Sequence, residues 1–368
     1  MTKRENEVFE LIKENPLISQ QECATRLGIS RSAVAGHIMN LMSKGYIKGK
    51  GYILKKDPYI VVIGGSNIDI LGSPDSTYIS RDSNPGTINL SPGGVGRNIA
   101  ENLARMGITV KLLSVMGNDL YGKLLLQESR SAGIDMNHVM VLENETTSVY
   151  LSILDENKDM ISAVSSMSIV KKIDRAYIKK NNGIITGSSL IIVDANLSEE
   201  IIKYIVLKYK HKDIFIDTVS STKAEKVKTF IGDFHTIKPN KIEAEKLLGI
   251  RINTIDDMKK ASMIFIDKGV KKVFLTMGDK GILYTDEEQS VFYESKPVKA
   301  VNASGAGDAF TAALAYSYME NRSVKETLDF ASAASELTVL HSQTINPNIS
   351  VEKIMKQIKE RVNDRKIS

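Results

Sequence analysis

The sequence predicts an α/β protein preceded by a small helical domain. Runs rich in Val, Ile and Leu alternate with helix-patterned stretches from residue 57 to the end of the 368 residues. Strands that are apolar throughout are typical of a parallel sheet covered on both faces. All of the excess positive charge lies before residue 57. We therefore expect two domains, 1–56 and 57–368, the second with a central, mostly parallel sheet between helices.

Composition indicates a globular protein outside the membrane. Hydrophobic residues make up 42% of the chain and charged residues 25%, and no apolar run approaches the roughly 18 residues of a membrane helix. The polar N-terminus shows no signal peptide, so we expect a cytoplasmic protein without a membrane partner. Cys23 is the only cysteine, which excludes an internal disulfide and predicts a small buried residue.

Charge distinguishes the first domain from the second. Residues 1–56 hold ten Lys and Arg against five Glu, whereas the remainder holds 39 of each sign. Within the first domain, residues 26–56 contain seven basic residues and no acidic one. A concentrated basic stripe is a weak indication of nucleic-acid binding.

Three helices and a hairpin are expected in the first domain. An apolar face predicts a first helix that stops at Asn15 and Pro16. Ser19 and Ser30 are suited to cap the second and third helices, and Gly28 to end the second. Two short strands around a Gly-Lys-Gly turn follow within 46–54. The third helix is expected to span 31–44 and to bury Val34, Ile38, Leu41 and Met42.

This order of elements resembles a winged helix-turn-helix of the kind seen in many bacterial regulators. The resemblance implies that Arg31 and Ser32 open a recognition helix whose first residues reach base edges. Lys48 and Lys50 in the wing, together with Lys44, Lys55 and Lys56, would meet DNA phosphates. A helical module for protein contacts or dimerisation is the alternative.

The second domain should begin with a strand and continue in strand–helix alternation. Segments 72–90 and 146–165 mix Thr, Ser, Tyr and Ile and predict a small sheet or lid outside the main body. The expected strands of the main sheet are 59–63, 110–115, 190–193, 214–216, 236–237 and 273–276. The expected helices include 97–106, 122–132, 242–248, 255–268 and 308–319.

Polar and Gly-rich clusters fall where an α/β sheet places ligand groups, past the carboxyl ends of strands. They lie at 64–69, 91–98, 238–243 and 276–281, with a further one at 301–308. None of them is a GxxxxGK[ST] loop or a GxGxxG fingerprint.

The segment 301–308 is the most informative of these clusters. Gly305, Ala306 and Gly307 are small and open an apolar helix, so their N–H groups can gather phosphate oxygens. Asp308 lies beside this anion site. A carboxylate there can remove the proton of a hydroxyl that attacks a phosphate, which favours a kinase. We expect Asp308 to stay ionised near the helix N-terminus and to be a weak base.

The order of these clusters resembles the phosphofructokinase-B, or ribokinase-like, family of sugar and nucleoside kinases over essentially all of 57–368. Two motifs carry the resemblance: Gly-Gly-x-x-x-Asn at Gly93, Gly94 and Asn98, and Gly-Ala-Gly-Asp at 305–308. The family implies a mostly parallel sheet between helices with a β lid. It also implies that Asp308 is the general base and that the N–H groups of Gly305, Ala306 and Gly307 form the anion hole.

The same resemblance implies the remaining ligands and a dimer formed through the lid. Asn67, Asp69, Gly93, Gly94 and Asn98 would hold the acceptor sugar. Asn240, Thr276, Gly278 and Ser304 would lie on the ATP side, with Glu243 ordering Mg²⁺ through water. Where the family commonly has Asp-Thr, this chain has Asn302 and Ala303. That Asp helps many members bind K⁺, so a requirement for K⁺ stays open.

Within the family, this chain most resembles the pseudouridine kinases. The resemblance lies in the segments 63–69, 91–107, 301–302 and 344–347. The resemblance implies phosphorylation of the 5′-hydroxyl of pseudouridine, with another nucleoside such as inosine or uridine, or a plain sugar, as alternatives. Together with the helix-turn-helix it suggests a kinase that regulates its own operon. The rival hypothesis is a transcriptional regulator that uses the kinase fold as a nucleoside or sugar sensor.

Overall fold

The computed structural model describes residues 1–49, 58–295, 298 and 300–367. The described residues form two compact units, Met1–Pro58 and Tyr59–Ser368. Lys50, Lys55, Lys56 and most of the expected wing hairpin lie outside the described residues.

The N-terminal unit is a bundle of α1 (Lys3–Glu14), α2 (Gln20–Leu27) and α3 (Arg31–Ser43). The Ser19 and Ser30 hydroxyls accept the N–H groups of Glu22 and Ala33, as expected of N-caps. Gly28 ends α2 with a φ of 63°, the left-handed conformation that favours glycine. The buried core consists of Val8, Ile12, Ile18, Cys23, Ala24, Val34, Ile38, Leu41 and Ile47.

One expectation for this unit was wrong, and Lys44 has a contact that was not predicted. Met42 is 41% exposed, because Leu41 takes the inward position at that turn of α3. Lys44 donates to both carboxylate oxygens of buried Glu5 at 2.7 and 2.8 Å. It therefore holds α1 against the end of α3, since Glu5 lies in the first turn of α1. Arg31, Ser32 and Lys48 are exposed, as a DNA-contacting role requires.

The main sheet of the second unit has the strand order β14-β13-β12-β11-β10-β9-β1-β4. Six neighbouring strands of this sheet, β4, β1, β9, β10, β11 and β12, run parallel to one another. Strands β13 and β14 are added antiparallel at the edge beyond β12. The parallel strands are β1 (Ile60–Ile63), β4 (Val110–Leu113), β9 (Leu190–Asp194), β10 (Ile214–Asp217), β11 (Thr236–Ile237) and β12 (Lys272–Thr276). The antiparallel strands are β13 (Ile282–Thr285) and β14 (Ser290–Tyr293).

The expected strand 110–115 is in fact interrupted. After β4 the chain leaves the main sheet, and β5 (Val115–Gly117) pairs with β6 (Met140–Leu142). The break falls at Ser114, whose buried hydroxyl contacts the Gly64 carbonyl at 2.7 Å and the Ser66 hydroxyl at 2.9 Å. The side chain thus joins the ends of β1 and β4 where the sheet stops.

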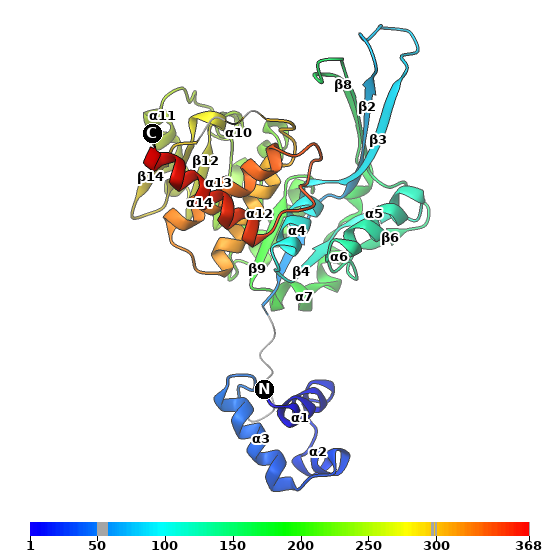
Figure 1. Ribbon diagram of the computed structural model, residues 1–368, viewed down its shortest axis with the longest axis vertical. Coiled ribbons are helices and arrows are strands. Elements are labelled where there is room, and N and C mark those ends of the chain that lie inside the picture. Colours follow the sequence, from blue (N-terminus) through cyan, green and yellow to red (C-terminus); the bar gives the residue numbers. More distant parts are fainter. Residues whose placement is uncertain (50–57, 296–297, 299, 368) are drawn as a thin grey trace. The chain divides into compact units, whose positions relative to one another are not determined.

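A second sheet projects from the body (Figure 1). Its strand order is β3-β2-β7-β8, with β2 (Asn67–Pro74), β3 (Gly86–Gly93), β7 (Val149–Leu154) and β8 (Met160–Ser166). We call it the lid. It begins earlier in the chain than expected, so Asn67, Asp69 and Gly93 lie in strands at its base rather than in loops.

Helices cover both faces of the main sheet. Residues of β1 alternate between two cores: Ile60 and Val62 pack with α4, α12 and α13, whereas Val61 and Ile63 pack with α8 and α11. The bounds are α4 (Val95–Arg105), α5 (Leu120–Ser131), α6 (Arg175–Lys180), α7 (Asn182–Gly187), α8 (Glu199–Lys208), α9 (Ser221–Ala224), α10 (Lys241–Leu248), α11 (Ile255–Asp267), α12 (Ala306–Met319), α13 (Val324–Val339) and α14 (Val351–Ile367). Among the described helices, none is long and apolar enough to cross a membrane.

Candidate active site

Helix α12 begins at a turn that only glycine can make. Gly305 has a φ of 79°, and a Cβ on it would lie 1.9 Å from the Thr344 carbonyl oxygen. The segment around Thr344 therefore packs directly on the start of α12. The first-turn N–H groups of a helix have no intrahelical acceptor, and they carry a partial positive charge.

Asp308 lies in the first turn of α12, where it is 9% exposed. Its Oδ2 accepts a hydrogen bond from Asn98 Nδ2 at 2.8 Å. This bond brings together two residues 210 positions apart in the chain. It joins α12 to α4, the helix that follows the lid strand β3.

Asn98 is positioned by the turn at Gly94, which precedes α4. Gly94 has a φ of 97°, and a Cβ there would lie 2.5 Å from the Ser66 Cα. The Asn98 N–H donates to the Gly94 carbonyl at 2.7 Å. Asn98 is 4% exposed, and its Oδ1 has no hydrogen-bond partner among the described residues. A buried amide oxygen left free in this way is a candidate acceptor for a substrate hydroxyl.

The lid base supplies the other expected acceptor-side groups. Asn67 Nδ2 donates to Asp69 Oδ1 at 2.6 Å. Gly93 lies against the same carboxylate, because a Cβ on Gly93 would be 2.2 Å from Asp69 Oδ2. Desolvation raises the pKa of Asp69, while the Asn67 amide and Arg97 oppose that shift. Asn67, Asp69 and Gly93 therefore lie together at the lid base, next to the start of α4, the helix that carries Asn98.

Sequence reasoning missed Asp194, which holds the backbone of this region. Its Oδ2 accepts the N–H groups of Gly65 at 2.8 Å and Gly96 at 2.7 Å, and its Oδ1 accepts that of Asn196 at 2.8 Å. The turn after β1 and the start of α4 are therefore tied to the end of β9. The sequence feature that could have identified Asp194 is an acidic residue at the end of an apolar strand, where the strand reaches the carboxyl edge of the sheet.

Asp217 gives the same signal at the end of β10 and was also missed. It accepts a hydrogen bond from Thr311 of α12 at 2.8 Å and lies 3.6 Å from Lys238 Nζ. Lys238 is 9% exposed and borders Gly307, since a Cβ on Gly307 would lie 3.1 Å from Nζ. A buried ammonium group beside the start of α12 adds a full positive charge to the anion site. Lys238 was noted in a polar cluster, but no role was predicted for it.

The pKa of Asp308 differs from the expectation of an ordinary ionised carboxylate. Burial, followed by the nearby Asp217 carboxylate, raises it to about 8, while Asn98 and Lys238 act in the opposite direction. The position of Asp308 at a helix N-terminus did not by itself predict its pKa, because desolvation and a like charge outweigh the field at the start of the helix. A raised pKa makes Asp308 a stronger base once it has lost its proton.

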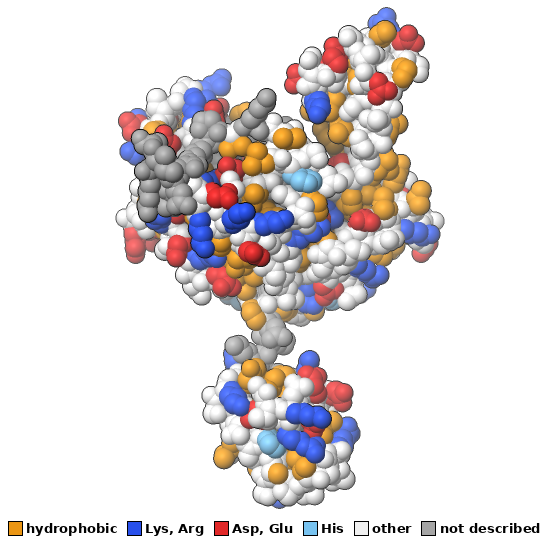
Figure 2. Space-filling view, viewed as in Figure 1, with side chains coloured by type: hydrophobic (Ala, Val, Ile, Leu, Met, Phe, Trp, Pro, Cys, Tyr) orange, Lys and Arg blue, Asp and Glu red, His pale blue; other side chains and the backbone are white. Residues whose placement is uncertain are grey.

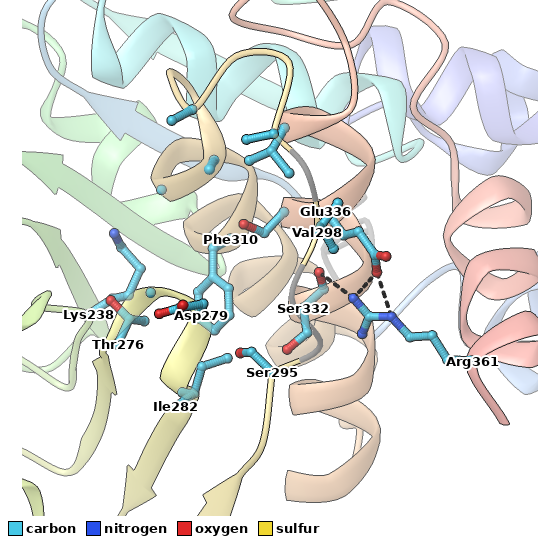
Figure 3. Close-up of a pocket in the computed structure, with 17 residues that line it drawn as sticks. Lys238, Thr276, Asp279, Ile282, Ser295, Val298, Phe310, Ser332, Glu336 and Arg361 are labelled. Carbon is cyan, nitrogen blue, oxygen red and sulfur yellow. Dashed lines mark hydrogen bonds and ion pairs between the residues drawn. The ribbon is translucent and has the colours of Figure 1, made fainter. Parts of the chain in front are cut away.

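A cavity of about 420 Å³ opens on the other side of the α12 start. Lys238, Thr276, Gly278, Ala306 and Gly307 line it, and in the close-up Lys238 and Thr276 lie at the end opposite Arg361 of α14 (Figure 3). Its middle is apolar, with Phe310 central in the view (Figure 3). The apolar lining comprises Ile282, Val298, Phe310 and Val339. An apolar slot that ends at N–H groups and an ammonium is suited to a nucleotide.

The expected Mg²⁺ residues are close together but are already hydrogen-bonded. Asn240 caps α10, and its N–H and Nδ2 donate to Glu243 at 3.0 Å each. Glu243 Oε2 also accepts the Thr218 hydroxyl at 2.7 Å. Among the described residues, no three His, Cys, Asp or Glu side chains form a metal cage. The arrangement fits Mg²⁺ that is carried by nucleotide phosphates and held through water, since that ion keeps several waters.

Two of the four expected ATP residues do not line this cavity: Asn240, which lines a neighbouring pocket with Thr276 and Gly278, and Ser304. Ser304 is the residue set further apart. The Ser304 side chain is exposed. Its N–H donates to Asn302 Oδ1 at 2.9 Å, and Asn302 Nδ2 donates to the Ser342 carbonyl at 3.0 Å. Ser304 thus belongs to a loop braced by Asn302.

Comparisons with known proteins agree with this geometry. Residues 57–351 match the family model described as pfkB family carbohydrate kinase, and residues 1–48 match a winged helix-turn-helix DNA-binding model. The uncharacterized sugar kinase YeiI of Escherichia coli (strain K12) is 37% identical over 96% of this chain and 98% of its own length. The pseudouridine kinase of the same organism is 35% identical over 82% of this chain and 97% of its own length.

Solved structures give the same result. A putative sugar kinase from Clostridium perfringens is 37% identical, with a TM-score of 0.76 over 83% of this chain and 97% of that one. The family models confirm both resemblances drawn from the sequence, to the kinase family and to the winged helix-turn-helix, and the strand order together with the solved structure confirms the mostly parallel α/β fold.

The electrostatics of Asp308 can be tested without turnover. A carboxyl group whose pKa is raised in the folded state stabilises that state below its unfolded pKa, and this stability is lost as pH rises through the folded value. Asp308→Asn removes the titration and keeps an oxygen that Asn98 can bond. From pH 5 to pH 8.5, the unfolding free energy of the variant should therefore rise relative to wild type. We expect more than about 1.4 kcal/mol, the equivalent of one pKa unit. Urea denaturation at both pH values measures it; a difference independent of pH would contradict the raised pKa.

Proposed function

Because the chain belongs to the pfkB family of carbohydrate kinases, we propose that it transfers the γ-phosphoryl group of ATP to the 5′-hydroxyl of a nucleoside, with pseudouridine as acceptor. The observation that carries this proposal is the 2.8 Å bond between Asn98 and Asp308. This bond joins α4, which follows the lid strand β3, to the first turn of α12, and it supports an acceptor site on that side of the turn. On the other side, that turn borders the nucleotide cavity through Gly307.

In the proposed reaction Asp308 accepts the proton of the 5′-hydroxyl. The hydroxyl oxygen forms a bond to the γ-phosphorus, and the bond from that phosphorus to the bridging β-oxygen breaks, so ADP leaves with the electron pair. The N–H groups of residues 305–307 and the Lys238 ammonium stabilise charge on the transferring group. Asn98 Oδ1 and Asp69 would orient the sugar. Asn240 and Glu243 would hold Mg²⁺ through water beside the nucleotide phosphates, and the ion would supply neutralisation of the phosphate charge.

The choice of pseudouridine rests on similarity rather than on geometry. The Escherichia coli relative named pseudouridine kinase is 35% identical, and the one named as a sugar kinase is 37% identical. Another nucleoside or a free sugar is therefore the second candidate. A coupled ADP-release assay over pseudouridine, uridine, inosine and ribose separates them.

Asp308→Asn should lower kcat for the preferred acceptor by at least about 10²-fold, the scale of one acid–base group. The physical reason is the loss of the only proposed proton acceptor while the Asn98 contact is kept. The ADP-release assay at saturating ATP measures the effect. Asp256→Asn, at an 81% exposed side chain of α11, is the matched control and should have wild-type activity. Unchanged turnover in the Asp308 variant would remove Asp308 as the base.

We further propose that the N-terminal unit binds DNA through α3. The match to a winged helix-turn-helix model and the exposure of Arg31 and Ser32 at the start of α3 support this. Together with catalysis, DNA binding would let the protein regulate its own operon. Ligand-dependent DNA affinity without any ADP production would instead support the sensor hypothesis.

Lys48→Met should weaken DNA binding by a similar factor for all sequences and should reduce the salt slope by about one, because one phosphate contact is lost. Fluorescence anisotropy with genomic DNA fragments from about 50 to 200 mM salt measures both. Lys3→Met, at the exposed start of α1, is the control. Binding that stays flat as salt rises would support the alternative of a dimerisation or protein-contact module.

We also propose a homodimer formed through the lid. Leu90, Ile70, Leu151 and Val164 face one another across four strands. Alternation along a strand puts them on the face opposite Asp69. Val164 is 63% exposed and Leu90 48%, and Figure 2 shows apolar side chains along this projecting sheet. An exposed apolar sheet face outside the site is typical of an interface.

Val164→Glu should convert the dimer into a monomer, because the new charge would be buried without a partner in the interface. Light scattering coupled to size exclusion measures the mass. Leu207→Glu, at a 57% exposed position of α8, is the matched control and should leave the dimer intact. A wild-type monomer at micromolar concentration would contradict the proposed dimer.

A further inference from the structure

Basic residues of the second unit are concentrated in two segments on either side of β9. The unit as a whole is neutral, with 39 residues of each sign in 57–368. The segments 175–190 and 201–212 nevertheless hold seven Lys and Arg, one His and no acidic residue. The first segment covers α6 and α7, and the second covers most of α8 and the turn that follows it.

Side-chain contacts bring these two segments together. The Tyr209 hydroxyl, at the end of α8, donates to Asn182 Oδ1 of α7 at 3.1 Å. The Tyr204 ring of α8 lies between two cations, because its centroid is 5.3 Å from the Arg175 guanidinium of α6 and 5.5 Å from the Lys208 ammonium. The basic residues of α6 and of the end of α8 therefore share one face of the unit.

Three lysines of this face have no carboxylate partner. Lys179 and Lys180 end α6, and Lys210 follows α8. All three are exposed, and none forms an ion pair with another described residue, whereas the nearby Arg175 pairs with Glu200 at 2.8 Å. We call these three lysines the lysine face. Ammonium groups that lack a counterion on the protein remain available to a polyanion.

The lysine face lies at the amino edge of the main sheet. Lys212 Nζ donates to the Ser188 carbonyl at 2.7 Å, and these two residues each lie two positions before a strand, β10 and β9. The candidate active site lies past the carboxyl ends of the same strands. The second unit also begins at the amino edge, since the Tyr59 hydroxyl donates to the Ile184 carbonyl of α7 at 2.7 Å. The chain that comes from the winged helix-turn-helix unit therefore enters beside α7 (Figure 1).

We propose that the lysine face binds the phosphate backbone of duplex DNA, an inference that rests on the proposed DNA binding through α3. A duplex held by the first unit is tethered to the second unit by the chain that leads to Tyr59, which raises its effective concentration at the lysine face. Duplex DNA is favoured over other polyanions because residues 1–48 of the same chain match a DNA-binding model. Lysines neutralise phosphates without reading bases, so the face adds affinity and salt dependence and leaves specificity to α3.

The test measures binding of the full chain to two duplexes by fluorescence anisotropy at several salt concentrations. Both come from a genomic fragment that the wild-type protein binds. One has about 10 base pairs, the helical turn that a recognition helix covers, and the other about 30 base pairs. The variant with Lys179→Met, Lys180→Met and Lys210→Met should match wild type on the short duplex. On the long duplex, its affinity at about 50 mM salt should fall at least about tenfold, and its salt slope should fall by about three, one for each lost phosphate contact.

A second triple variant is the matched control for net charge. Lys123→Met, Lys353→Met and Lys359→Met remove the same charge from exposed positions of α5 and α14. This control should bind both duplexes as wild type does. An equal loss of salt slope in the two triple variants, or no loss in either, would overturn the proposal. The lysine-face variant should keep the wild-type kcat for ADP release, which shows that it is folded.

Arg31→Met, at the start of α3, separates this inference from the proposed role of α3. Weaker binding of both duplexes by Arg31→Met, with a wild-type slope in the lysine-face variant, supports α3 and overturns the lysine face. Unchanged short-duplex binding by Arg31→Met, with weaker long-duplex binding by the lysine-face variant, contradicts the role of α3 and supports the lysine face. A single-stranded RNA that displaces the long duplex more effectively than unlabelled duplex would overturn duplex DNA as the partner, as would a wild-type protein that binds no duplex.

Discussion

The hydrogen bond from Asn98 to Asp308 is the contact on which the proposed chemistry depends. It bridges α4 and α12, and each helix starts at a glycine with positive φ against which another segment is packed. Ser66 packs on Gly94 and Thr344 on Gly305, so neither turn tolerates a side chain. The bond therefore fixes two helix starts at one point, with the lid base on one side and the nucleotide cavity on the other.

Burial of charge is the second constraint at this point. Asp194, Asp217, Lys238 and Asp308 are each less than a tenth exposed. Asp194 is stabilised by three backbone N–H groups, and Asp217 by Thr311 and Lys238. Asp308 accepts a hydrogen bond from the neutral Asn98 amide, and burial, followed by the nearby Asp217 carboxylate, raises its pKa to about 8. Burial also raises the pKa of Asp194, but the backbone N–H groups that surround Asp194 give it a structural role.

Local sequence signals were sufficient for part of this picture. The apolar strands and the caps at Ser19 and Ser30 depend on neighbours within a few positions, whereas Gly94, Asn98 and Asp308 were identified through motifs that resemble those of a known family. Asp194 and Lys238 were not assigned roles, because their partners come from strands or helices distant in sequence. The break at Ser114 has the same origin, since its bonds go to the end of β1. The pKa of Asp308 depends on Asp217, which no local pattern connects to it.

A crystal structure of the protein with pseudouridine, Mg²⁺ and a non-hydrolysable ATP analogue tests the central claim most directly. The account predicts that the 5′-hydroxyl lies within about 3.2 Å of the Asp308 carboxylate, with the γ-phosphate at the N–H groups of residues 305–307. It also predicts that Asn98 keeps its bond to Asp308. A nucleoside hydroxyl directed away from Asp308, or a nucleotide bound outside the cavity beside Gly307, would contradict it.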